Sequence, residues 1–134
     1  MQQYAKFSFT ITKPTYIPEG YIQVDENYSI ENEAKEPVVS LNYSDGEFVF
    51  WTNQQKINQK DIMEEMQEAG PFEKSETYSL NGVQFDYVSS NDESASFRGG
   101  MRVTVPEKGY KIVMFAEVLT KEEMEKVLLS MIEK

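Results

Sequence analysis

Paired carboxylates are the groups in this chain whose type and spacing come closest to a catalytic arrangement. The two pairs are Glu64-Glu65 and Glu122-Glu123. General acid–base catalysis needs both groups to reach one substrate, but adjacent residues of a helix do not face one another. Acidic residues are also favoured at helix starts and on solvated faces, so both pairs predict exposed helix surface. An enzyme built on carboxylates alone stays a less favoured alternative.

Two acidic turns carry oxygen atoms that a hard cation could use. They are Asp45-Gly46-Glu47 and Asn91-Asp92-Glu93. Calcium takes several oxygens, and a strong calcium loop spaces its Asp and Asn residues evenly before a distal Glu. Neither turn has that spacing, and the same residue types are typical of plain turns. We therefore expect no metal site.

The absence of two residue types excludes much catalytic chemistry. The 134 residues include no cysteine and no histidine. Disulfides, thiol nucleophiles and thiolate metal sites are excluded, and so are histidine bases and histidine metal ligands. Four serines have no histidine to activate them: Ser89, Ser90, Ser94 and Ser96. The composition predicts a protein that is not an enzyme and that uses no cofactor.

Charge narrows the range of partners. The chain has 13 basic and 23 acidic residues, which gives a net charge of −10. Such a surface repels nucleic acid phosphates and anionic lipid head groups, so neither is an expected partner. Arg98-Gly99-Gly100 could present amides and a guanidinium to an anion, but a bulge or a close backbone approach within a strand explains it better. There is no apolar run of about 18 residues, so we expect no direct insertion of this segment into a membrane.

Apolar side chains offer one candidate ligand site. Trp51, Met66, Met124 and Met131 combine an aromatic ring with adaptable thioethers. Together they could line a pocket for a lipid, an acyl chain or a peptide. Core packing is the competing interpretation, because aromatic residues dominate the cores of sheets. Of the candidate sites, this pocket is the one that we keep as a hypothesis.

Strands dominate the elements that would position these residues. Alternating Phe7, Phe9 and Ile11 predict a first strand with one buried face. Further strands are predicted at 21–30, 38–43, 47–53, 77–80, 83–89, 97–105 and 110–119. Asp45-Gly46 and Asn81-Gly82 predict hairpin turns. The strand at 47–53 has apolar residues on both faces, which favours a central position.

Two helices complete the pattern. Asn58 to Ala69 has a capping residue and a narrow apolar stripe that Gly70-Pro71 ends. Thr120 to Glu133 begins with a capping box and continues with the apolar spacing of a helix that lies on a sheet. We predict an α+β fold with a single antiparallel β-sheet of about six to eight strands. The C-terminal amphipathic helix packs on one face, a second short helix lies mid-chain, and residues 1–134 form one domain.

A stiff elbow, Pro14 to Tyr21, is the most distinctive local pattern. Its prolines keep the chain extended, and Glu19-Gly20 then turns it. With this elbow in place, the order of motifs resembles the bacterial domain-of-unknown-function 4367 family. The motifs that carry the resemblance are the opening Phe-x-Phe strand, the segments 16–21, 39–43, 48–54, 80–83 and 109–112, and the helix at 119–132.

The resemblance implies a location but no site residues. Domains of this family usually sit outside the membrane of Gram-positive bacteria, behind a membrane helix or a lipid anchor, sometimes in relatives of anti-sigma regulators. The resemblance therefore implies a non-catalytic, extracytoplasmic binding or sensing domain of a cell-envelope protein, with an unknown protein or small-molecule partner. The alternative is a small carrier of an apolar ligand held between the sheet and the C-terminal helix. If Met1 is the true start, a cytoplasmic location is expected instead. The oligomeric state stays open.

Overall fold

A computed structural model describes residues 12–29, 38–57, 72–90, 97 and 99–132 of the chain. Within these residues lie seven strands and one helix. They are β1 (Ile22–Ser29), β2 (Val38–Ser44), β3 (Val49–Lys56), β4 (Lys74–Leu80), β5 (Val83–Ser89), β6 (Gly99–Val105), β7 (Tyr110–Ala116) and α2 (Lys121–Ile132). The predicted first strand around Phe7 to Ile11 and the predicted helix from Asn58 to Ala69 lie outside the described residues.

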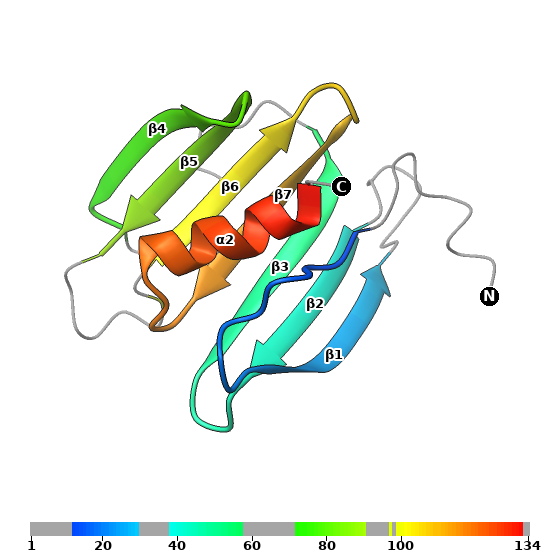
Figure 1. Cartoon of the computed structure of the whole chain (residues 1–134), viewed down its shortest axis with the longest axis vertical. Helices are drawn as coiled ribbons and strands as arrows, with labels where there is room; N and C mark the ends of the chain where they lie inside the picture. Colours follow the sequence, from blue (N-terminus) through cyan, green and yellow to red (C-terminus); the bar gives the residue numbers. More distant parts are fainter. Residues whose placement is uncertain (1–11, 30–37, 58–71, 91–96, 98, 133–134) are drawn as a thin grey trace.

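The seven strands form one antiparallel sheet, which confirms that part of the predicted α+β fold. The strand order is β1-β2-β3-β7-β6-β5-β4, and every neighbouring pair is antiparallel. The sheet is built from two meanders, β1 to β3 and β4 to β7, which join where β7 pairs with β3 (Figure 1). β3 is therefore an interior strand, as its apolar residues on both faces predict.

Helix α2 covers one face of the sheet over β6 and β7, which confirms the predicted position of the C-terminal helix (Figure 1). The Thr120 hydroxyl accepts the N–H of Glu123 at 3.1 Å and so satisfies one of the free amides at the helix start. The apolar stripe of the helix faces the sheet and is buried: Met124, Val127, Leu128, Met131 and Ile132. We call this side of the sheet the helix face.

The segment from Thr12 to Gly20 runs across the helix face beside α2, seen as the dark blue trace in Figure 1. The N–H of Thr12 donates to Gln54 Oε1 of β3, and the N–H of Thr15 donates to Ser130 Oγ of α2, each at 3.0 Å. Tyr16 and Ile17 pack against the core that α2 and the sheet enclose. The segment from Thr12 to Gly20 therefore covers part of the helix face beside α2.

Of the two explanations offered for Gly99-Gly100, the structure shows the close approach at Gly99 and no bulge. The pairing of β6 with β5 and with β7 runs through both glycines without a shift in register. A Cβ atom at Gly99 would lie 3.0 Å from Met124 Cε and 3.4 Å from the ring of Tyr87. Glycine lets the helix lie this close to the strand. The irregularity in pairing occurs in β1, between Gln23 and Asp25.

Candidate interaction surface

The structure does not bring together the three described residues of the predicted apolar pocket. Met124 and Met131 lie between α2 and the sheet and are 0% and 1% exposed. Trp51 is half-buried on the opposite face, where its ring meets the edges of Phe97 and Phe115 at centroid distances of 4.9 and 5.4 Å. Met66 lies outside the described residues. The two methionines and the tryptophan thus belong to two separate apolar clusters.

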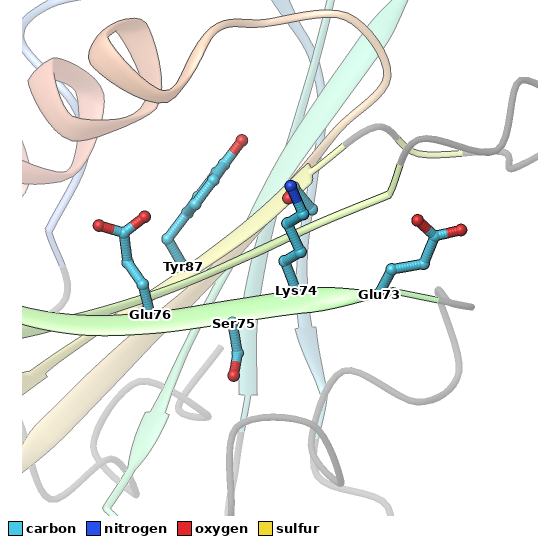
Figure 2. A pocket seen from close by; sticks show the side chains of 6 residues that line it. Glu73, Lys74, Ser75, Glu76 and Tyr87 are labelled. Carbon is cyan, nitrogen blue, oxygen red and sulfur yellow. The ribbon is translucent and has the colours of Figure 1, made fainter.

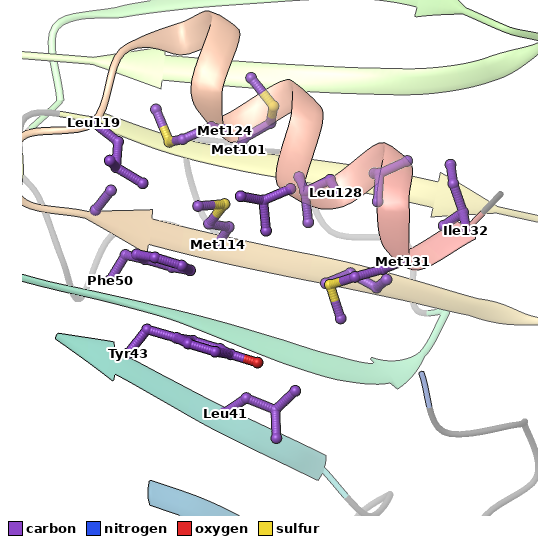
Figure 3. Close-up of a cluster of buried hydrophobic side chains, with 14 of the residues drawn as sticks. Leu41, Tyr43, Phe50, Met101, Met114, Leu119, Met124, Leu128, Met131 and Ile132 are labelled. Atoms are coloured by element: carbon purple, nitrogen blue, oxygen red, sulfur yellow. The ribbon is translucent and has the colours of Figure 1, made fainter. Parts of the chain in front are cut away.

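The space between α2 and the sheet is occupied by the protein's own side chains. Figure 3 shows Met124, Leu128 and Met131 of the helix facing Met101 of β6 and Met114 of β7, and all of these side chains are buried. A methionine bends to fill irregular gaps, so the four methionines pack this interface closely. The arrangement is that of a core, the competing interpretation that the sequence left open.

In the acidic turn Asp45-Gly46-Glu47, the carboxylate of Asp45 accepts hydrogen bonds from the backbone. Asp45 Oδ1 accepts the N–H groups of Glu47 and Phe48, both at 2.8 Å, and these hydrogen bonds lower the pKa of Asp45. Gly46 has φ of 98°, which suits a turn. The described residues contain no group of three or more acidic side chains that could hold a metal ion. The second acidic turn, Asn91-Asp92-Glu93, lies outside those residues.

A buried ion pair on the face opposite α2 is a feature that the sequence pattern did not indicate. The Arg102 guanidinium lies 2.9 Å from Asp86 Oδ2, with side chains that are 10% and 3% exposed. Thr77 Oγ1 donates to the other carboxylate oxygen at 2.6 Å. These three residues are cross-strand neighbours on β4, β5 and β6. The network ties together the strands of one half of the sheet.

A groove of about 430 Å³ lies along the outer strand β4, lined by Glu73, Lys74, Ser75, Glu76, Tyr87 and Ser89. Figure 2 shows Lys74, Glu76 and Tyr87 on one side of the strands and Ser75 on the other. Burial raises the pKa of the Tyr87 hydroxyl above its usual value of 10.0, which disfavours the phenolate that a nucleophile or base would need. Glu76 binds Lys121 of α2 at 3.0 Å. The groove therefore offers charges of both signs but no activated nucleophile or base.

The opposite edge of the sheet has a different character. β1 exposes two large aliphatic side chains, Ile22 at 66% and Val24 at 56%. Between them and the end of the strand lie the acidic residues Asp25 and Glu26. Lys13, which directly precedes the elbow, forms an ion pair with Glu26 at 2.9 Å. We call β1 with these side chains the β1 edge.

Exposed large aliphatic side chains are few among the residues that the structure describes. Among the described residues, the large hydrophobic side chains classed as exposed are Ile22, Val24 and Val118. Two of the three thus lie within three residues of one another on a terminal strand of the sheet. Large apolar side chains at a sheet edge mark interaction sites or aggregation hazards, so the β1 edge is the candidate interaction surface. No helix of the described residues is long and apolar enough to span a membrane.

Comparison with known proteins gives a family match and solved structures with a similar fold. The profile of a family described as "Domain of unknown function (DUF4367)" matches residues 11–131. No curated protein matches the chain. A MucA/MucB complex from Pseudomonas aeruginosa is similar at 17% identity and a TM-score of 0.49, covering 91% of this chain and 34% of that one. A crystal structure of MucB with MucA(peri) is similar at 18% identity and a TM-score of 0.48, covering 90% and 36%. The chain thus spans about a third of the length of the structures it matches, and likeness at this level carries nothing about function.

Proposed function

We propose that this chain, which belongs to the DUF4367 family, is a non-catalytic domain that binds a partner protein outside the cell membrane of a bacterium. The observation that carries the binding role is the β1 edge, where Ile22 and Val24 are exposed on a terminal strand. Burial of these two side chains against a partner would contribute about 1.5–3 kcal/mol each, which would favour binding at this edge.

The extracytoplasmic location is supported by the resemblance, which implies a domain held outside the membrane by a helix or a lipid anchor elsewhere in the full-length protein. The chain has no cysteine or histidine, so its polar groups favour recognition over catalysis. Under this proposal the domain forms the outer part of a cell-envelope protein, and its sheet presents the binding surface.

Two measurements in intact host cells test the proposal. The full-length protein is first treated with an added protease, with the cell membrane intact and then lysed. We expect cleavage of this domain in both cases, and protection in intact cells would show that the domain is cytoplasmic. A photo-reactive amino acid is then placed singly at exposed positions on each side of the domain: Val24 on β1, Ser79 on β4 and Glu122 on α2. One discrete protein adduct from one side supports a partner-binding role, whereas no adduct from any side contradicts it.

The carrier alternative requires space for a ligand between the sheet and α2. A ligand held between the sheet and α2 would have to displace Met124 and Met131, which are 0% and 1% exposed. α2 would therefore have to move away from β6 and β7. Native mass spectrometry of the protein purified from its host tests this alternative, because a carrier would retain a bound lipid at a defined mass.

A further inference from the structure

Three carboxylates from separate parts of the chain lie near one buried tyrosine, at the end of the sheet where β3 begins and β7 ends. They belong to Asp45 in the turn between β2 and β3, Glu117 in the connection from β7 to α2, and Glu123 in the first turn of α2. The tyrosine is Tyr21, whose ring packs on Phe50 of β3 at a centroid distance of 5.2 Å. We call the three carboxylates and Tyr21 the acidic end.

Backbone contacts hold these parts of the chain against one another. The N–H of Val49 donates to Glu117 Oε1 at 2.9 Å, and the N–H of Glu117 donates to the carbonyl oxygen of Val49 at 3.2 Å. A Cβ atom at Gly20 would lie 3.8 Å from Asp45 Cβ, so the turn of the elbow lies beside the turn between β2 and β3 (Figure 1). Two backbone N–H groups also hold Asp45 Oδ1. Two of the three carboxylates are therefore fixed in place, which reduces the entropy lost when a ligand binds.

The Tyr21 hydroxyl lies among these carboxylates and has no partner of its own. Tyr21 is 9% exposed, and its hydroxyl forms no hydrogen bond with any residue that the structure describes. Burial raises the pKa of Tyr21, and the charges of Asp45, Glu123 and Glu117 raise it further. Because the effect of a charge falls with distance and with screening, the hydroxyl lies close to all three. A polar side chain this deeply buried is normally paired, so the hydroxyl indicates a place for a ligand.

The negative charges of the acidic end are not neutralised by basic side chains. None of the ion pairs among the described residues includes Asp45, Glu117 or Glu123. The capping box at the start of α2 forms in one direction: the Thr120 hydroxyl accepts the N–H of Glu123, but between these two described residues no hydrogen bond joins the Thr120 N–H to the Glu123 carboxylate. The Glu123 carboxylate is therefore available to a ligand that carries positive charge.

The arrangement fits an arginine side chain better than a metal ion. Among the described residues, no group of three or more acidic side chains could hold a metal ion. A guanidinium is larger, and its five N–H donors spread in a plane, so it can reach carboxylates that are too far apart to share one ion. The Tyr21 hydroxyl oxygen can accept one of these donors. A lysine ammonium is compact and strongly hydrated, so it would reach fewer of the acceptors.

Two exposed aliphatic side chains border the acidic end. Val118 directly follows Glu117 and is 46% exposed, and Ile22 directly follows Tyr21 and is 66% exposed. Ile22 is also part of the β1 edge, so the acidic end adjoins the candidate interaction surface. A partner that places an arginine here can bury its neighbouring aliphatic side chains on these two residues.

We infer that the acidic end binds an arginine side chain of the partner protein. The guanidinium lies between the three carboxylates and donates to the Tyr21 hydroxyl oxygen, and aliphatic residues beside the arginine pack on Val118 and Ile22. The inference rests on the proposed function and specifies the chemistry of the partner. The net charge of −10 would also attract a basic segment before contact.

The test measures the binding of short peptides to the full chain by amide NMR. The probe is the peptide Gly-Val-Arg-Val-Gly with both termini blocked, and the control replaces arginine with citrulline, which has the same shape without the charge. We expect the arginine peptide to bind with a Kd of about 1 mM or below and to shift the amide signals of residues 117–123. The citrulline peptide should bind about tenfold more weakly, and a lysine peptide should also bind more weakly than the arginine peptide.

Glu123→Gln and Glu122→Gln form a matched pair, because each removes one negative charge from the first turn of α2. Glu122 is exposed and is not among the charges that act on Tyr21. Glu123→Gln should weaken binding of the arginine peptide by about fivefold or more, and Glu122→Gln by less than about twofold. Tyr21→Phe keeps the ring on Phe50 and should weaken binding by about threefold. The amide spectrum of each variant shows whether it is folded.

Four results would overturn the inference. They are no binding of the arginine peptide at about 10 mM, equal binding of the citrulline peptide, equal binding of the lysine peptide, or equal effects of Glu123→Gln and Glu122→Gln. A photo-reactive residue at Val118 in host cells separates this failure from that of the proposed function. An adduct from Ser79 but none from Val118 would keep a partner-binding role and refute the acidic end as its site. The absence of an adduct from Val118 and from every other tested position would refute the role itself.

Discussion

At the scale of single residues, Asp86 and Arg102 show how a polar pair is held inside this sheet. Both side chains are nearly excluded from water, and Thr77 supplies a further hydrogen bond to the carboxylate. Removal of one partner of a buried pair leaves a charge without compensation and typically costs about 3–5 kcal/mol. Asp86→Ala should therefore lower the free energy of unfolding by roughly 3 kcal/mol in urea titrations.

The exposed pair between Lys121 and Glu76 is the natural comparison. Its side chains are 35% and 55% exposed, and solvent screens such a pair. Glu76→Ala should cost less than about 1 kcal/mol in the same titrations. Equal costs for Asp86→Ala and Glu76→Ala would mean that the buried pair does not hold β4, β5 and β6 together.

At the scale of elements, the sequence correctly predicts those turns and helix ends that depend on neighbouring residues alone. Asn81 and Gly82 both have positive φ, at 54° and 78°, and they form the hairpin turn that their types predict. The Thr120 cap also predicts the start of α2 to within a residue, since a cap acts on the first turn alone. Turns and caps need no information from distant parts of the chain.

Features that depend on pairing across the chain could not be predicted in this way. Alternation in β3 places Phe50 and Trp51 on opposite faces, but it does not say which face receives the helix, so the predicted pocket combined residues from both. The pairing of β3 with β7 and the contact of Asp86 with Arg102 depend on the sheet register. The sequence pattern did not predict the exposed side chains of the β1 edge, because their exposure depends on the position of β1 in the strand order.

The C-terminal helix gives a prediction at the same scale. Leu128 is fully buried in the middle of the α2 stripe, between the helix and the sheet. Leu128→Ala should lower the free energy of unfolding by about 2–5 kcal/mol, because it removes buried methyl groups and leaves a cavity. Glu122→Ala, on the exposed side of the same helix, should change it by less than about 0.5 kcal/mol. A small effect of Leu128→Ala would contradict the packing of α2 on this face.

At the scale of the whole molecule, stability should depend on the ionisation of tyrosines that are buried or half-buried. Burial is the main cause that raises the pKa values of Tyr21, Tyr43, Tyr78, Tyr87 and Tyr110 above the usual value of 10.0. For Tyr43 the pKa rises to about 12, and the nearby Glu26 carboxylate adds to the effect. The ring of Tyr43 stacks on Phe50 at a centroid distance of 4.9 Å, inside the core.

A raised pKa in the folded state fixes the sign of the pH dependence. Below about pH 9 the tyrosines are neutral in both states, and their contribution to stability is fully present. Above that pH the unfolded chain loses these protons first, so the free energy of unfolding falls as the pH rises from 10 towards 12. Urea titrations at increasing pH should show a constant midpoint up to about pH 9 and a falling one beyond it.

The lysine ion pairs also weaken in this range, so the variant Tyr43→Phe is needed to separate the effect of the tyrosine hydroxyl from theirs. This variant should lose less stability than the wild type between pH 10 and 12, and identical slopes would show that the Tyr43 hydroxyl ionises without disturbing the core.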